Sequence, residues 1–152
     1  LLGAWNVKCP NFVANPEITF EEGGRRYEPG VLNAQGMLGM KASADLLTEV
    51  GIESVASRLL DLKRALLEGM ATLKYSPIGP RGGSGASGIS SFTDLENPDR
   101  VSSAFRTLHE NGVVLSFRHD RDGVPYLRFS PHFYNTFEEV ERIMKILRDS
   151  RT

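Results

Sequence analysis

Two arginines near the C-terminal end of the chain have the chemistry to bind a small anion. Arg128 lies in the middle of a β-prone run, where strand alternation places Leu127 and Phe129 in the core and Arg128 on the opposite face. Arg118 ends the preceding β-prone run, so we expect both guanidinium groups on one side of a small sheet. A guanidinium fork binds a carboxylate through two parallel hydrogen bonds. The alternative, in which each arginine pairs with a surface carboxylate of the protein, is left open by the spacing alone.

The other reactive side chains indicate neither a metal site nor a nucleophile. The histidines of the chain are His109, His119 and His132. None of them has a second histidine or a cysteine at ligand spacing. Cys9 has no histidine close enough along the chain to act as its base, so we expect a small packed residue. Asp120 and Asp122 are expected to serve a solvated turn.

A glycine-rich run matches the sequence pattern of a phosphate-binding loop but not the structural context that such a loop needs. Residues 83–88 match the pattern G-x-G-x-x-G, which holds a pyrophosphate when a strand precedes it and a helix follows it. A strand is predicted after this run instead. We therefore favour a flexible glycine loop over a phosphate cradle.

Composition narrows the function classes. The chain has 152 residues, of which 40% are apolar, enough for one ordinary domain. A net charge of −1 gives no broad positive field for nucleic acid or anionic lipid, and no apolar run is long enough to cross a bilayer. A single cysteine and the lack of a signal peptide favour the cytoplasm. The chain begins without Met inside an apolar stretch, which favours a piece of a longer protein.

Two long helices are predicted in the first half. Residues 1–31 show loops and a short strand at 17–20, and helices are expected over 32–50 and 52–73. In the second helix, apolar residues recur every three or four positions. The solvent side of that helix is expected to hold Glu53, Arg58, Lys63 and Glu68.

The second half predicts an α+β fold. Residues 77–88 are expected to be a loop because they contain five glycines and two prolines. Strands are predicted at 88–93, 113–118 and 126–130, and helices after Asn97 and after Thr136, which forms a capping box with Glu139. The order strand, helix, strand, strand, helix predicts a small antiparallel sheet covered by helices.

Two sequence runs, in this order and separated by a long helix, resemble the class V aminotransferases, a family of pyridoxal-phosphate enzymes that includes cysteine desulfurases, selenocysteine lyases and kynureninase-like enzymes. They are Gly-Arg-Arg-Tyr-Glu-Pro-Gly-Val-Leu-Asn at 24–33 and Leu-Arg-Phe-Ser-Pro-His-Phe-Tyr-Asn-Thr at 127–136, before an acidic helix start. The resemblance covers nearly the whole chain. It implies the C-terminal domain of the pyridoxal-phosphate-dependent transferase fold, working as a cytoplasmic homodimer.

The resemblance also implies roles for individual residues. Arg128 is similar to the arginine that holds the α-carboxylate of an amino-acid substrate. Arg118, the second candidate substrate-binding residue, falls near the loop where cysteine desulfurases keep an arginine followed by histidines and a catalytic cysteine. Gly30 and Val31 resemble the loop that reaches the cofactor phosphate of the other subunit. Because Val31 replaces the usual threonine, only backbone N–H donation remains. Arg118-His119 is followed by Asp120 rather than the cysteine motif of cysteine desulfurases, which argues against persulfide chemistry.

No lysine of this chain stands in the context of the Schiff-base lysine of the family. The resemblance therefore implies that residues 1–31 end the large cofactor-binding domain and carry the dimer-side loop, and that residues 32–152 form the small domain. We expect no catalytic residue in this chain, an inactive protein in isolation, and an active transferase or lyase in the full-length enzyme.

Two other functions remain compatible with the sequence. One is a non-enzymatic interaction module, and the other is a regulatory domain that binds a carboxylate effector through the same arginines. An interaction module would bury or neutralise Arg128, whereas an enzyme domain would leave it poorly paired and facing a cleft.

Overall fold

The computed structural model describes residues 2–8 and 16–150, so the prediction for Cys9 lies outside the described residues. Contacts along the chain define two compact units, Leu1–Glu49 and Val50–Thr152. The assignment of residues 1–31 to a large domain stays a prediction.

The first unit is organised around the buried side chain of Asn6. Its oxygen accepts a hydrogen bond from the backbone N–H of Gly3 at 2.9 Å, and its amide donates to the carbonyl of Arg26 at 3.1 Å. A 3-10 helix, η2, spans Gly23–Tyr27. The strand predicted at 17–20 is wrong: among the described residues only Phe20 pairs there, in an isolated bridge with Val7. The single pairing partner explains this, because a strand needs a neighbour along its length to satisfy its backbone groups.

Helix α1 spans Ala34–Val50, two residues shorter than predicted, and none of its residues is buried. Asn33 accepts a hydrogen bond from the backbone N–H of Gly36 at 2.9 Å and so caps its first turn. Exposed apolar side chains along the helix are Met37, Leu38, Met40, Leu46 and Val50.

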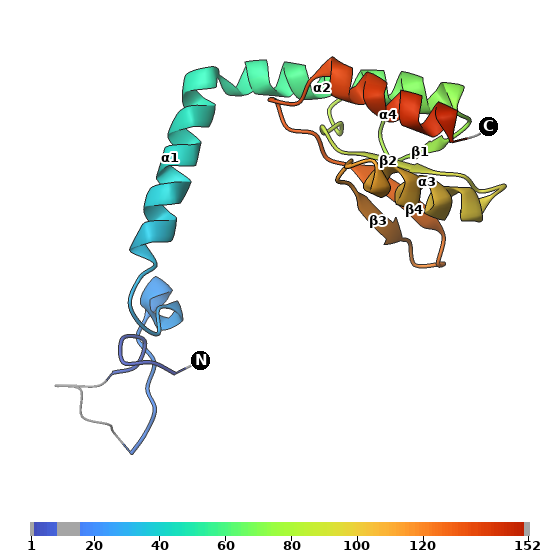
Figure 1. The fold of residues 1–152 in the computed structure, drawn as a ribbon. Coiled ribbons are helices and arrows are strands. Elements are labelled where there is room, and N and C mark those ends of the chain that lie inside the picture. Colours follow the sequence, from blue (N-terminus) through green and yellow to red (C-terminus); the bar gives the residue numbers. More distant parts are fainter. Residues whose placement is uncertain (1, 9–15, 151–152) are drawn as a thin grey trace. The chain divides into compact units, whose positions relative to one another are not determined.

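The second unit is a four-stranded antiparallel sheet with three helices (Figure 1). The helices are α2 (Ile52–Thr72), α3 (Pro98–Glu110) and α4 (Phe137–Asp149), and the strands are β1 (Ser76–Ile78), β2 (Ser90–Thr93), β3 (Ser116–His119) and β4 (Pro125–Phe129). The strand order is β1-β2-β4-β3, and every pairing is antiparallel. The α+β class predicted from the sequence is confirmed.

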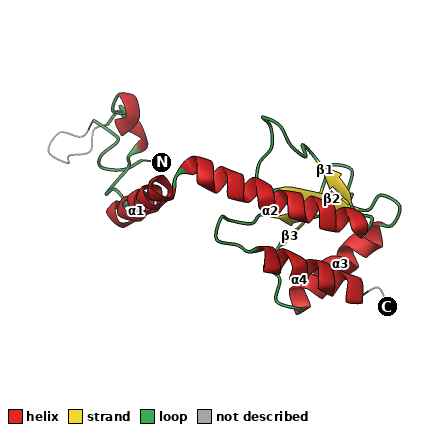
Figure 2. Ribbon diagram, turned by 90° about the horizontal axis from the view of Figure 1, so that it is seen from above, coloured by secondary structure: helices red, strands yellow, loops and turns green. Residues whose placement is uncertain are grey.

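All three helices pack on one face of this sheet, as the view from above shows (Figure 2). Phe92, Leu127 and Phe129 point from the sheet into the shared core, and Phe92 and Leu127 are fully buried. The helices contribute Leu62, Leu66, Met70, Val101, Leu108, Val140, Met144 and Leu147 to the same core. The opposite face of the sheet carries the other set of alternating side chains.

Strand β1 was not predicted, because Pro77 and Ile78 were assigned to a loop. Pro77 lies opposite Phe92 at the edge of the sheet. A proline is compatible with an edge strand because its missing N–H removes no bond to a further neighbour. The predicted loop is therefore shorter at its start, and residues 79–89 join β1 to β2.

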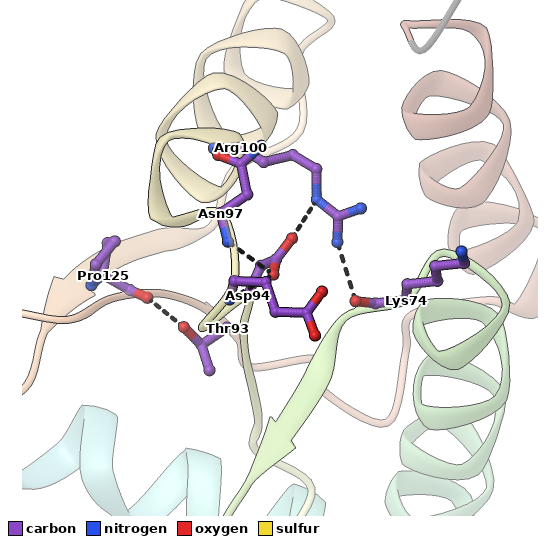
Figure 3. Close-up of polar contacts among 7 residues, drawn as sticks. Lys74, Thr93, Asp94, Asn97, Arg100 and Pro125 are labelled. Atoms are coloured by element: carbon purple, nitrogen blue, oxygen red, sulfur yellow. Dashed lines mark hydrogen bonds and ion pairs between the residues drawn. The ribbon is translucent and has the colours of Figure 1, made fainter.

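The corner between α2 and α3 is held by a polar cluster (Figure 3). Arg100 Nε pairs with Asp94 Oδ2 at 2.7 Å, and its Nη2 donates to the carbonyl of Lys74 at 3.0 Å. The Arg100 guanidinium also lies 4.2 Å from the ring centroid of Tyr75. Asn97 caps α3 as predicted.

Candidate functional site

The face of the sheet turned away from the helices brings the two predicted arginines together. Arg128 in β4 lies between Ser91 in β2 and Ser116 in β3, whereas Arg118 in β3 lies opposite Tyr126. Arg118 and Arg128 therefore occupy diagonal positions on adjacent strands. Diagonal neighbours on one face have Cβ atoms about 7–8 Å apart, within reach of long side chains. Their predicted placement on one side of the sheet is confirmed.

Arg128 is half-buried and incompletely paired. Its Nη2 donates to Ser116 Oγ at 3.4 Å, a long bond to a neutral acceptor. Its Nε is buried and has no hydrogen-bond partner among the described residues. Removing a guanidinium N–H donor from water without giving it an acceptor is unfavourable. A ligand oxygen that accepts a hydrogen bond from this Nε would therefore be stabilised.

The ion pairs among the described residues do not involve the two arginines. The pairs are Lys8–Glu22, Lys41–Asp45, Arg64–Asp61 and Arg100–Asp94, and neither Arg118 nor Arg128 takes part in one. Arg118 is exposed at the edge strand β3. The surface-pairing alternative is therefore absent from the described part of the chain.

The carboxylate closest in sequence to Arg118 serves the hairpin turn. Asp120 Oδ1 accepts hydrogen bonds from the backbone N–H groups of Asp122 at 3.0 Å and Val124 at 2.8 Å. Gly123 has a φ of +81°, which a glycine adopts without strain. The predicted turn role is confirmed for the carboxylate of Asp120, which the turn keeps occupied beside a cationic face, whereas Asp122 contributes its backbone N–H.

Gly30 and Val31 lie just before α1 in the first unit. Val31 is 87% exposed, and space for a side chain is open at Gly30. The backbone N–H groups of both residues make no hydrogen bond to another described residue. They are free to donate to an anion.

Lys63 was wrongly predicted to face solvent. It is only 5% exposed, and its ammonium donates to the carbonyls of Ser87 and Ile89, each at 3.1 Å. A signal for this was present, because Leu59, Lys63, Leu66 and Met70 follow one another at spacings of four, three and four along a single helix stripe. Arg58 is also not free in solvent, since its Nη2 donates to the carbonyl of Asn135 at 2.9 Å.

The comparisons with known proteins agree with this architecture. The family model described as "Aminotransferase class-V" matches residues 2–143. A probable cysteine desulfurase of Pyrococcus abyssi is 27% identical over 132 residues, which cover 82% of this chain and 32% of that protein.

Two solved structures show the same fold over 99% of this chain and 38% of theirs. The apo cysteine desulfurase of Thermococcus onnurineus NA1 has a TM-score of 0.78 at 22% identity. The cysteine desulfurase CsdA of Escherichia coli has a TM-score of 0.80 at 19% identity. The chain thus spans about a third of the length of the relatives it matches.

An α+β unit with this sheet order and this helix layer is part of the pyridoxal-phosphate-dependent transferase fold. The chain belongs to the class V aminotransferase family, whose cofactor is pyridoxal phosphate.

No helix among the described residues is long and apolar enough to cross a membrane. Among the same residues, no three His, Cys, Asp or Glu side chains come together as a metal site.

The described lysines differ in their surroundings. The buried lysine, Lys63, is bound to two carbonyls, and Lys41 is paired with Asp45 at 2.6 Å. Lys8 is within 3.8 Å of Glu22, and Lys74 and Lys145 are exposed. We assign no step of the chemistry to a lysine of this chain.

Proposed function

We propose that this chain is the C-terminal, substrate-side part of a pyridoxal-phosphate enzyme that acts on an amino acid or a related amine. The incomplete pairing of Arg128 carries the proposal. Its buried Nε has no partner among the described residues, and its one described hydrogen bond goes to a serine hydroxyl. A carboxylate at this face would supply the missing acceptor and the missing negative charge.

Arg118 extends the same cationic face toward the edge of the sheet. From its diagonal position it would favour an anionic group of the substrate without competing for the acceptor of Arg128. Gly30 and Val31 would donate their free N–H groups to the phosphate of the cofactor in a homodimer. The reaction would be a transfer or lyase reaction in the cytoplasm, and the chain in isolation would be inactive.

The pairing of Arg128 weighs against an interaction module. A module of that kind would be expected to bury or neutralise a mid-strand arginine, and no described residue neutralises this one. A carboxylate-effector domain would use the same arginines, so it has to be separated by experiment.

The test is the binding of an amino acid by the full-length enzyme. We expect Arg128→Ala to weaken L-alanine binding, measured by calorimetry, while pyridoxal phosphate stays bound. An effector domain would instead show binding of L-alanine that does not compete with turnover. Unchanged affinity in Arg128→Ala would contradict the proposal.

A further inference from the structure

Lys63 is a buried cation for which the proposed function has no use. Its ammonium is enclosed by α2 and by the chain just before β2, and no described carboxylate forms an ion pair with it. Removing an ammonium from water and pairing it only with neutral carbonyls is costly. A methionine would fill a similar volume without that cost. The lysine therefore contributes something other than volume, namely the position of the two carbonyls that it holds.

Those carbonyls belong to residues on either side of a glycine that packs directly on α2. Lys63 Nζ reaches Ser87 O and Ile89 O, each at 3.1 Å. A Cβ added at Gly88, between them, would lie 3.1 Å from Leu59 Cβ, one helical turn before Lys63. Leu59 and Lys63 thus hold residues 87–89 against the helix, and we call this contact the α2 clamp.

The α2 clamp lies at the end of the sheet where Arg128 is found. Residues 79–89 connect β1 to β2 (Figure 1). Ile78, at the end of β1, lies opposite Ser91. Ser91 in turn lies opposite Arg128. The two ends of the glycine-rich connection therefore lie close to Ile78 and Ser91, which line up with Arg128 across the sheet. The clamp fixes the end that leads into β2.

We infer that Lys63 is a positioning residue for the carboxylate site at Arg128. By fixing Ser87 and Ile89, it sets the path of the chain into β2, where Ser91 lies opposite Arg128. Without the clamp, the chain that leads into β2 has more conformations to lose when a ligand binds at Arg128, which weakens binding. The inference rests on the proposed role of Arg128.

The test compares Lys63→Met, which keeps the length and removes the donors, with Lys63→Arg, which keeps donors. Both are made in the full-length holoenzyme, and Lys145→Met on the exposed side of α4 is the matched control. We expect Lys63→Met to raise the dissociation constant for L-alanine about tenfold, the size of effect that loss of a charge-assisted hydrogen bond produces. Lys63→Arg should restore most of the affinity, and Lys145→Met should change nothing.

A second readout separates positioning from a role in stability alone. Amide hydrogen exchange over residues 87–91 should become faster in Lys63→Met and stay slow in Lys63→Arg. An unchanged affinity for L-alanine in Lys63→Met overturns the inference, even if the melting temperature falls. If Lys63→Met does not fold, Gly88→Ala disturbs the same clamp through Leu59 and is expected to weaken L-alanine binding as well. Unchanged affinity in Gly88→Ala overturns the inference.

The failure of this inference can be distinguished from failure of the proposed function. If Arg128→Ala loses affinity for L-alanine and Lys63→Met keeps it, only the role of Lys63 is wrong. If Arg128→Ala binds L-alanine as tightly as the unsubstituted enzyme, both the carboxylate site and the role of Lys63 are overturned.

Discussion

Arg128 and Ser116 lie opposite each other in the β3–β4 ladder, and the arginine donates from Nη2 to the serine Oγ at 3.4 Å. The bond is long and its acceptor is neutral, so Ser116 orients the guanidinium without neutralising it. The positive charge of Arg128 remains available on the face of the sheet that no helix of this unit covers.

The first prediction concerns catalysis by the full-length enzyme. Arg128→Ala should reduce kcat/KM for the amino-acid substrate by an amount equivalent to about 2–4 kcal/mol, the cost of deleting one partner of a charge-assisted pair in a desolvated site. Arg128→Lys should rescue little, because an ammonium lacks the planar fork. Steady-state kinetics with a bound cofactor measures this.

Two controls belong to that experiment. Ser116→Ala removes only the 3.4 Å bond and should leave kcat/KM within a few-fold of the original value. Urea unfolding should show little loss of stability in Arg128→Ala, because the residue forms no ion pair with the described part of the chain. An Arg128→Ala enzyme that unfolds would identify a structural role instead.

The second prediction concerns the cofactor. The chain of 152 residues should form no stoichiometric covalent adduct with pyridoxal phosphate, because by the resemblance to the family none of its lysines stands in the context of the Schiff-base lysine. Absorbance titration of the purified chain measures this. A saturable band with one equivalent of cofactor, abolished by replacing a single lysine, would contradict the prediction.

The third prediction concerns the corner between α2 and α3. Arg100→Met should lower the free energy of unfolding by about 1–3 kcal/mol, because it leaves the nearly buried carboxylate of Asp94 and the carbonyl of Lys74 without their guanidinium partner. Arg64→Met is the matched control. Its ion pair with Asp61 is largely exposed, so its loss should change the stability by no more than about 0.5 kcal/mol. Equal effects of the two substitutions in urea unfolding would show that the corner is not held by Arg100.

The fourth prediction concerns pH and the start of α4. The Glu139 carboxylate accepts hydrogen bonds from the Asn135 side chain and the Thr136 backbone N–H, each at 2.9 Å. These bonds, the side-chain bond first, lower the pKa of Glu139 below its ordinary value of 4.5. Its stabilising contribution is therefore complete above pH 4.5 and is lost as the pH falls through the lowered pKa.

Glu139→Gln should accordingly weaken the dependence of stability on pH below 4.5. The amide keeps an acceptor for the capping box but carries no charge to protonate. Glu141→Gln, on the same helix and outside the capping box, should leave that dependence as it is. Urea unfolding between pH 7 and pH 3 compares the variants, and identical profiles for Glu139→Gln and the unsubstituted chain would refute the assignment.

Local patterns in the sequence were sufficient for most of the second unit. The caps at Asn97 and Thr136 and the alternation of Leu127, Arg128 and Phe129 are each decided by residues a few positions apart. The resemblance of the runs at 24–33 and 127–136 pointed to the family that the comparisons then showed. All of these signals come from residues that lie close together in the sequence.

Features that depend on distant partners required the tertiary structure. Strand β1 exists because Phe92, fifteen residues after Pro77, provides the ladder beside which a proline is tolerated. The strand predicted at 17–20 fails because only Phe20 finds a partner in the described chain.

Lys63 is the clearest example of a residue whose environment depends on distant partners. Its charge predicts exposure, and only the arrival of the carbonyls of Ser87 and Ile89, more than twenty residues later, makes its burial tolerable. In the same way, strand alternation predicts from the sequence that Arg128 faces away from the core, whereas only the packing of distant segments shows that no described carboxylate forms an ion pair with it. The direction of a side chain follows from local backbone geometry, but its electrostatic partners are set by how distant segments pack.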